Sequence, residues 1–200
     1  MRLAVMFDLR TMIERFFQQV AAGSIEIYNE FSLQHELGIF LRAADAAGQY
    51  KVQFERPVGF FGLTRSAFVK NEIDLAVFRT DRSERAAIEV KFPRNGQYPE
   101  QMFKFCQDVA FVEQLVSAGF DAGLFLVAAD DPLFYSGPQR TGIYGPFRGS
   151  VPLQGTIVKP TGKHDETIEL RGSYAIQWRH AGLLRYAYIV ADPGRALHAL

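Results

Sequence analysis

The chain has one cysteine, no net charge and no long apolar run, and each absence excludes a class of protein. A single cysteine, Cys106, cannot build an intrachain disulfide framework or a cysteine-based structural zinc site. No run approaches the roughly 18 apolar residues that cross a bilayer, so no membrane partner is expected. With 22 basic and 22 acidic residues, the chain as a whole is no polycation. These absences together predict a soluble, cytoplasmic protein.

Several common catalytic signatures are also missing. The four histidines show no zinc-like spacing with one another or with Cys106. There is no Gly-x-Ser-x-Gly elbow of an acyl hydrolase, and no dinucleotide fingerprint follows a predicted strand. The nearest approach to a phosphate-binding loop, residues 155–163, has six residues between its glycines instead of four. The sequence therefore does not predict these three chemistries.

The chain contains enough hydrophobic residues to form the core of one domain. Of its 200 residues 48% are hydrophobic, including 18 Phe, 8 Tyr and 1 Trp. Apolar periodicity and the flanking glycines predict the order helix, helix, three strands, helix, strand. The predicted helices are 3–22, 31–47 and 100–117, and the predicted strands are 50–58, 73–79, 85–92 and 122–129. This order predicts an α/β fold in which helices cover both faces of a central mixed sheet.

The C-terminal third has weaker periodicity. Residues 136–155 hold five glycines and three prolines and are expected to form a loop. Beyond the loop we expect a β-rich extension, residues 156–200, packed on the same domain as the N-terminal helix and core of residues 1–135. Its predicted short strands are 156–159, 167–171, 175–179 and 184–190.

The most informative stretch is the pair of strands that carries two acids and a lysine. Glu89 and Lys91 lie two residues apart and so share one face of their strand. If the two strands form a hairpin that turns about residues 81–82, Asp74 lies directly opposite Glu89 on that face. Two carboxylates so placed must be separated by solvent, partly protonated or bridged by a cation. Oxygen ligands suit a hard metal such as Mg²⁺, although such a polar strand face is also commonly just solvated.

These residues resemble the motif of the PD-(D/E)xK nuclease superfamily, which has the restriction-endonuclease-like fold. The resemblance covers about residues 30–130, where helix, three strands, helix and strand follow in the order of that family's core. The family's first acid matches Asp74, its second matches Glu89 and its lysine matches Lys91. The proline of the motif's name is absent before Asp74, as in many relatives.

The resemblance implies a metal-dependent nuclease that hydrolyses phosphodiester bonds, with DNA as the expected substrate. Asp74, Glu89 and the carbonyl of Val90 would hold Mg²⁺ or Mn²⁺. Lys91 would activate or position the attacking water. Glu36, on the predicted helix 31–47, matches a further glutamate that the family often adds to the metal shell, although an edge glutamate in water is the alternative interpretation.

Three residues that follow the predicted strand 85–92 are candidates for binding the substrate. Arg94 and Lys104 flank the predicted site and could contact a phosphate backbone. Gln101 lies on the predicted helix 100–117, where some relatives carry a glutamine that orients the lysine or a phosphate. Ordinary solvated side chains are the alternative for all three positions.

A second function is compatible with the same residues. The fold could serve as a catalytically silent module that binds nucleic acid or a protein partner and keeps its acids only as charges. Residues 42–104 carry 11 basic and 8 acidic side chains, which is a small excess for binding a polyanion. Either this basic segment is focused on one face, or the chain works as a homodimer or with a partner protein.

Overall fold

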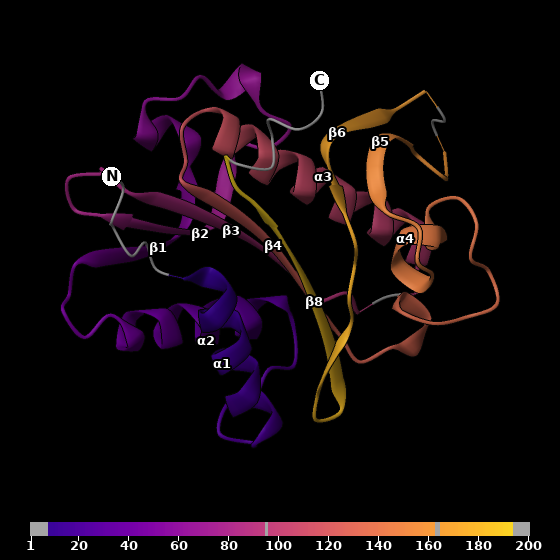
Figure 1. The fold of residues 1–200 in the computed structure, drawn as a ribbon, viewed down its shortest axis with the longest axis horizontal. Helices are drawn as coiled ribbons and strands as arrows, with labels where there is room; N and C mark the ends of the chain where they lie inside the picture. The colour runs from indigo at the N-terminus through magenta and orange to yellow at the C-terminus, as the bar shows by residue number, and fades with distance from the viewer. Residues whose placement is uncertain (1–7, 95, 163–164, 194–200) are drawn as a thin grey trace.

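A six-stranded mixed sheet forms the centre of the molecule, with α1 and α2 on one face and α3 on the other (Figure 1). The computed structural model describes residues 8–94, 96–162 and 165–193. The spatial order of the strands is β1-β2-β3-β4-β8-β7, and only β3 and β4 run parallel. The strands are β1 (Tyr50–Pro57), β2 (Glu72–Arg79), β3 (Arg85–Lys91), β4 (Ala122–Ala129), β7 (Arg179–Ala181) and β8 (Leu184–Ala191). The predicted α/β class is confirmed.

The two N-terminal helices cover one face of the sheet. They are α1 (Leu9–Ala21) and α2 (Glu30–Ala44). The predicted N-cap of α2 is confirmed, because the Asn29 side chain accepts a hydrogen bond from the Ser32 backbone N–H and the Ser32 hydroxyl accepts one from that of Asn29. Leu33, Leu37 and neighbouring apolar residues pack against the inner side chains of β2, β3 and β4. The cap thus fixes where α2 begins, beside the end of β3.

The β2–β3 hairpin has the predicted register. Leu75 pairs with Ile88 and Phe78 pairs with Arg85, which places the turn about residues 81–82. Arg82 adopts a positive φ of 61° in this turn. The register therefore places Asp74 and Glu89 opposite each other at the open end of the hairpin.

α3 (Tyr98–Ser117) connects β3 to the parallel strand β4 across the other face of the sheet. It begins with Pro99 in its first turn, a position that does not need the missing N–H. All eight residues of β4 are buried, as expected of a strand covered on both faces. Both elements pack against β3, so together they position its end.

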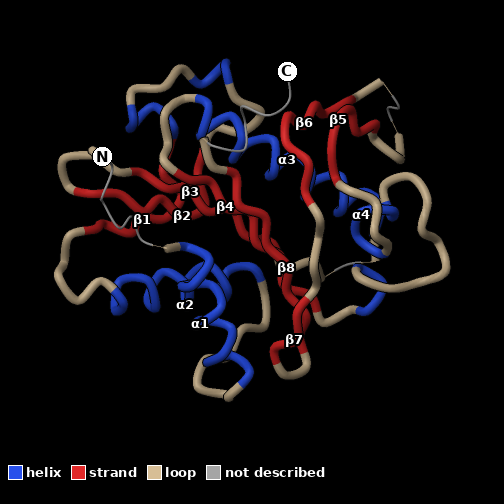
Figure 2. Tube along the Cα trace, in the orientation of Figure 1, coloured by secondary structure: helices blue, strands red, loops and turns tan. Residues whose placement is uncertain are grey.

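The C-terminal segment divides between two sheets (Figure 2). β8 pairs with β4 and β7 pairs with β8, so both extend the central sheet. β5 (Leu153–Val158) and β6 (Thr167–Tyr174) form a separate two-stranded sheet. Burial of β4 on both faces explains why β8 joins it, since a central strand needs a hydrogen-bonded neighbour on each side.

Two local predictions for this segment were wrong. The predicted loop 136–155 contains a short helix, α4 (Tyr144–Arg148), and the first residues of β5. The predicted strand 175–179 is absent from the described residues, where β7 begins only at Arg179. Instead the chain crosses between the two sheets there, and the Trp178 indole N–H donates to the carbonyl of Phe147. Tertiary packing of the tryptophan outweighs local strand propensity at this crossing.

In the described part of the chain, no helix combines the length and apolar character needed to span a bilayer.

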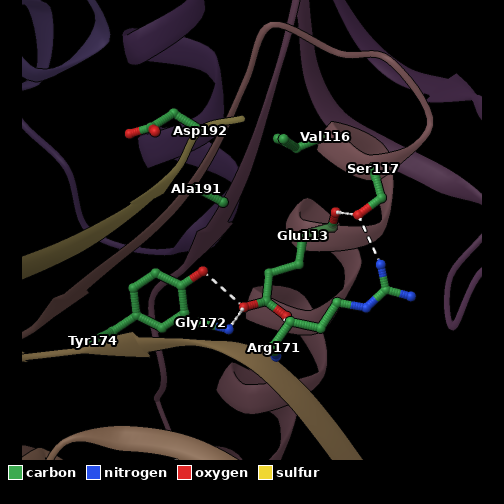
Figure 3. Close-up of a pocket in the computed structure, with 8 residues that line it drawn as sticks. All are labelled: Glu113, Val116, Ser117, Arg171, Gly172, Tyr174, Ala191 and Asp192. Atoms are coloured by element: carbon green, nitrogen blue, oxygen red, sulfur yellow. Dashed lines mark hydrogen bonds between the residues drawn. The ribbon is translucent and has the colours of Figure 1, made fainter. Parts of the chain in front are cut away.

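A buried carboxylate fastens the small sheet to α3 (Figure 3). Glu113 accepts hydrogen bonds from the backbone N–H groups of Arg171 and Gly172, at 2.9 and 2.7 Å, and from the Tyr174 hydroxyl at 2.7 Å. Its side chain lines a small pocket together with Val116 and Ala191. The carboxylate accepts from two part-buried backbone N–H groups and a buried hydroxyl of β6, so it docks β6 on the helix.

We expect Glu113→Gln to lower the free energy of unfolding by about 1–2 kcal/mol, because an amide cannot accept on both of its polar atoms and leaves one of these part-buried donors unpaired. Urea denaturation followed by circular dichroism measures this loss. Glu169→Gln, an exposed change on β6, is the matched control and is expected to stay within about 0.5 kcal/mol of the wild type. Equal losses for the two variants would show that Glu113 does not fasten the small sheet.

Candidate active site

Asp74 and Glu89 lie side by side at the open end of the β2–β3 hairpin. The Asp74 backbone N–H donates to Glu89 Oε1 at 3.1 Å, and the Val90 N–H donates to Asp74 Oδ2 at 2.9 Å. Glu89 is completely buried, whereas the Asp74 side chain keeps 13% of its surface exposed. The two acids therefore share one face of the sheet, as the predicted register requires.

Lys91 reaches the same place from the end of β3. Its Nζ donates to the carbonyl of Val90 at 2.9 Å and lies 3.8 Å from Asp74 Oδ2. The ammonium also lies 3.2 Å from Glu30 Oε1 and 3.5 Å from Asp108 Oδ2. The structure thus brings Asp74, Glu89, Val90 and Lys91 together, as the sequence predicts, and adds two acids.

Gln34 holds Asp74 in place from α2. The Gln34 amide Nε2 donates to the backbone carbonyl of Asp74 at 2.8 Å and to Glu55 Oε1 at 2.6 Å. Glu55 lies opposite Asp74 on β1 but has a φ of 48°, where the β1–β2 pairing skips one position. The buried amide replaces the missing ladder partner, so α2 sets the position of the Asp74 backbone.

Glu36 does not join this cluster. It lines a separate hollow between α1 and α2, beside Arg15 and Phe40. Glu30, in the first turn of α2, contacts Lys91 instead, and its Oε2 also accepts from the Phe92 N–H at 3.2 Å. Six residues rotate a helix by about 240°, so Glu30 and Glu36 cannot face the same site. Glu30, and not the predicted Glu36, therefore lies beside Lys91.

The three predicted substrate-binding residues lie near the surface. The exposed Arg94 pairs with Asp130, which follows β4. In the first turns of α3, Gln101 is half-buried and Lys104 is exposed. Their roles in binding the substrate stay predictions.

Besides Glu30, sequence reasoning missed two further members of the cluster, Lys70 and Asp108. Lys70 precedes β2, and its Nζ contacts Glu89 Oε2, lies 2.8 Å from Asp108 Oδ1 and lies 3.7 Å from Asp74 Oδ1. Asp108 comes from α3, where its side chain is only 3% exposed. The spacing of Lys70 and Asp74 could have suggested a shared face, but nothing in the sequence shows that Asp108 turns toward the sheet.

The charges in the cluster shift the pKa values of its members. Burial and the neighbouring Asp74 raise the pKa of Glu89 well above its usual range, although the Lys70 ammonium opposes this shift. Burial alone would lower the pKa of Lys91, but the carboxylates of Asp108, Asp74 and Glu30 raise it above its ordinary value. The pKa of Lys70 is raised in the same way by its three carboxylate neighbours. Both lysines therefore remain ammonium ions at neutral pH.

The donor set suits a hard divalent cation, but the side chains are arranged around ammonium groups. In the described residues, no three His, Cys, Asp or Glu side chains stand ready to hold a metal ion. The available donors are carboxylate oxygens and the Val90 carbonyl, which are the ligand types of Mg²⁺ and Mn²⁺. One of them, Asp108 Oδ2, is buried and accepts no hydrogen bond. The site thus fits such an ion in donor type and charge, provided that Lys70 moves.

Comparisons of the chain with protein-family models, with curated proteins and with solved structures found no match. The resemblance to the PD-(D/E)xK nucleases therefore depends on the motif and on the geometry of these side chains.

Proposed function

We propose that the protein is a metal-dependent nuclease of the PD-(D/E)xK type that hydrolyses phosphodiester bonds, with DNA as the substrate. One observation carries the proposal: Asp74 and Glu89 lie opposite each other on adjacent strands, with the Lys91 ammonium and the Val90 carbonyl beside them. The order of elements around this site also agrees with the core of that family.

Each residue has a role that its surroundings support. Asp74, Glu89 and the Val90 carbonyl would hold Mg²⁺ or Mn²⁺, which when bound polarises the phosphate and stabilises its developing charge. The neighbouring carboxylates raise the pKa of Lys91, and as an ammonium group it would position the attacking water and stabilise the charge on the phosphate. Glu30 orients the Lys91 ammonium through its contact at 3.2 Å.

The outer side of the cluster is the expected approach for the substrate. Exposure rises from the fully buried Glu89 to Lys70, at 29%, and Glu30, at 47%. Arg94 follows β3 by three residues and would contact the phosphate backbone near this edge, as would Lys104 on α3. The excess of basic charge in residues 42–104 is small, so a homodimer or a partner protein would add to the binding of DNA. We expect the protein to act in the cytoplasm.

The catalytically silent module remains the second candidate, and one observation favours it. The Lys70 ammonium already contacts three carboxylates of the site. If Lys70 stays there, it supplies the positive charge that the acids need, and the cluster is then only structural. The two functions differ in whether the protein responds to a divalent cation.

Cleavage assays test the proposal. Plasmid, duplex and single-stranded oligonucleotides are incubated with the wild type in Mg²⁺ or Mn²⁺ and, separately, in excess chelator. We expect cleavage by the wild type that the chelator abolishes, and a loss of about 100-fold or more in Lys91→Ala, which lacks the ammonium at the phosphate.

Lys51→Ala serves as the matched control, since it removes an exposed lysine of β1 outside the cluster and is expected to leave cleavage unchanged. Cleavage that is equal in the wild type and in Lys91→Ala would indicate a contaminating nuclease and contradict the proposal. Binding of DNA without cleavage in either metal would favour the silent module.

A further inference from the structure

Lys70 occupies the position between the carboxylates in which a bound cation would lie. We propose that Lys70 is an internal counter-ion of the metal site, displaced when a divalent cation binds to Asp74, Glu89 and Asp108. This inference rests on the proposed function, because it concerns the same metal site. It adds Asp108 to the ligands and gives Lys70 a role that the family motif does not include.

The contacts of Lys70 are those of a cation within a set of anionic ligands. Its Nζ touches Glu89 Oε2 and lies 2.8 Å from Asp108 Oδ1 and 3.7 Å from Asp74 Oδ1. These oxygens come from β3, α3 and β2, three elements that pack against one another. A single ammonium thus bridges three carboxylates, as a bound cation would.

Asp108 provides independent evidence that a divalent cation binds here. Its side chain is 97% buried, and while Oδ1 contacts Lys70, Oδ2 accepts no hydrogen bond. Oδ2 faces the Lys91 ammonium at 3.5 Å, which is too long for a strong hydrogen bond. Leaving a buried carboxylate oxygen without a hydrogen bond is costly. A divalent ion bound to both oxygens of this carboxylate would remove that cost.

The overall charge of the cluster also favours the exchange. Among the residues that the structure describes, Glu30, Asp74, Glu89 and Asp108 face two ammonium groups, those of Lys70 and Lys91. When all are ionised, two negative charges remain in a largely buried place. Replacing a singly charged ammonium by a doubly charged ion compensates more of this charge.

The ion and the Lys70 ammonium cannot share the site. Mg²⁺ holds its ligand oxygens at about 2.1 Å, so any cation hydrogen-bonded to the same oxygens would lie within a few ångströms of it. The Lys70 side chain can leave, because 29% of it is already exposed and it precedes β2 in a segment without regular structure. Release of this flexible side chain into solvent is the movement that binding requires.

Metal titration of Lys70→Met tests the exchange. Binding of Mn²⁺ alone is measured by electron paramagnetic resonance for the wild type, for Lys70→Met and for Lys159→Met. Lys159 is the matched control, since it also pairs with two carboxylates, those of Glu100 and Glu166, but lies outside the cluster. We expect Lys70→Met to bind Mn²⁺ about tenfold more tightly or better, because a competing unit charge is gone, and Lys159→Met to bind like the wild type.

A labelling measurement on the wild type covers the case in which Lys70→Met fails to fold. An amine-reactive acylating reagent is applied with and without Mn²⁺, and the acylation of each lysine is quantified by mass spectrometry. We expect acylation of Lys70 to rise several-fold with Mn²⁺, since the displaced amine is solvated and no longer ion-paired, while acylation of Lys159 stays constant.

The outcomes separate this inference from the proposed function. Equal Mn²⁺ affinity in the wild type and in folded Lys70→Met, or unchanged acylation of Lys70 in Mn²⁺-saturated wild type, overturns the inference even if the protein cleaves DNA. Tighter binding by Lys70→Met without cleavage by any variant supports the inference and overturns the nuclease function. No Mn²⁺ binding by either protein overturns both.

Discussion

Replacing Asp74 by asparagine is expected to lower metal-dependent cleavage by about three orders of magnitude. The reason is that Asp74 would hold the ion that stabilises the charge on the reacting phosphate. The change keeps the size of the side chain but removes the negative charge that the proposed ion needs. The Val90 N–H can still donate to the remaining oxygen of the amide, so we expect the fold to be retained. Cleavage rates at saturating Mg²⁺ and the far-ultraviolet circular dichroism spectrum provide the measurement.

Glu72→Gln is the matched control for this variant. Glu72 lies two residues before Asp74 on the same strand, and its side chain is exposed. Because the substitution removes the same charge from a neighbouring position outside the cluster, activity is expected to change by no more than about threefold. A large loss in Glu72→Gln, or near-normal activity in a folded Asp74→Asn, would contradict the assignment of the metal site to Asp74.

The largest effect on stability is expected at Gly123, where α3 lies directly against β4. A Cβ atom at Gly123 would lie 2.7 Å from Val112 Cβ and 2.8 Å from the Val112 carbonyl oxygen. The carbonyl belongs to the helix backbone and cannot move without shifting α3, so Gly123→Ala is expected to cost about 3 kcal/mol. In a protein of this size the loss corresponds to a decrease of about 6–12 °C in Tm. Differential scanning calorimetry and urea denaturation measure both quantities.

Gly59→Ala controls for the general effect of adding a methyl group to a glycine. Gly59 is exposed, has no positive φ, and a Cβ there would meet no atom within 4 Å. We expect its free energy of unfolding to change by less than about 0.5 kcal/mol. Comparable losses in the two variants would mean that the contact between α3 and β4 does not limit the volume at Gly123.

The Gly123 variant also connects the fold to the candidate site. Asp108 lies one helical turn before Val112 on α3, so a shift of the helix at Val112 would move the Asp108 carboxylate relative to Glu89. The close approach of α3 and β4 therefore determines the distance between the Asp108 and Glu89 carboxylates.

The amino-acid sequence was sufficient to predict the hairpin and the acids on it. Alternation of side chains along β2 and β3 and a turn about residues 81–82 set the register, and the register brings Asp74 to Glu89. Local rules suffice here, because adjacent antiparallel strands with a short turn leave little freedom in pairing. For the same reason the cap at Asn29 and the buried strand β4 could be predicted.

Predictions of contacts between elements far apart in the sequence were less successful. The helix that supplies a glutamate to Lys91 was predicted, but the wrong glutamate was chosen, since Glu36 faces α1 while Glu30 faces β3. Periodicity identifies the apolar stripe of a helix, but both glutamates lie off that stripe. Which of them meets the site depends on where the N-terminus of α2 lies against the sheet.

The sequence by itself thus determined the α/β class, the hairpin register and the meeting of two acids with a lysine. Only the tertiary structure placed Lys70 between the carboxylates and turned Asp108 of α3 toward them. It also joined β8 to β4. The physical reason is the range of the forces involved. Backbone periodicity and turn geometry act between near neighbours, whereas the docking of a helix or a late strand depends on packing among residues far apart in the chain.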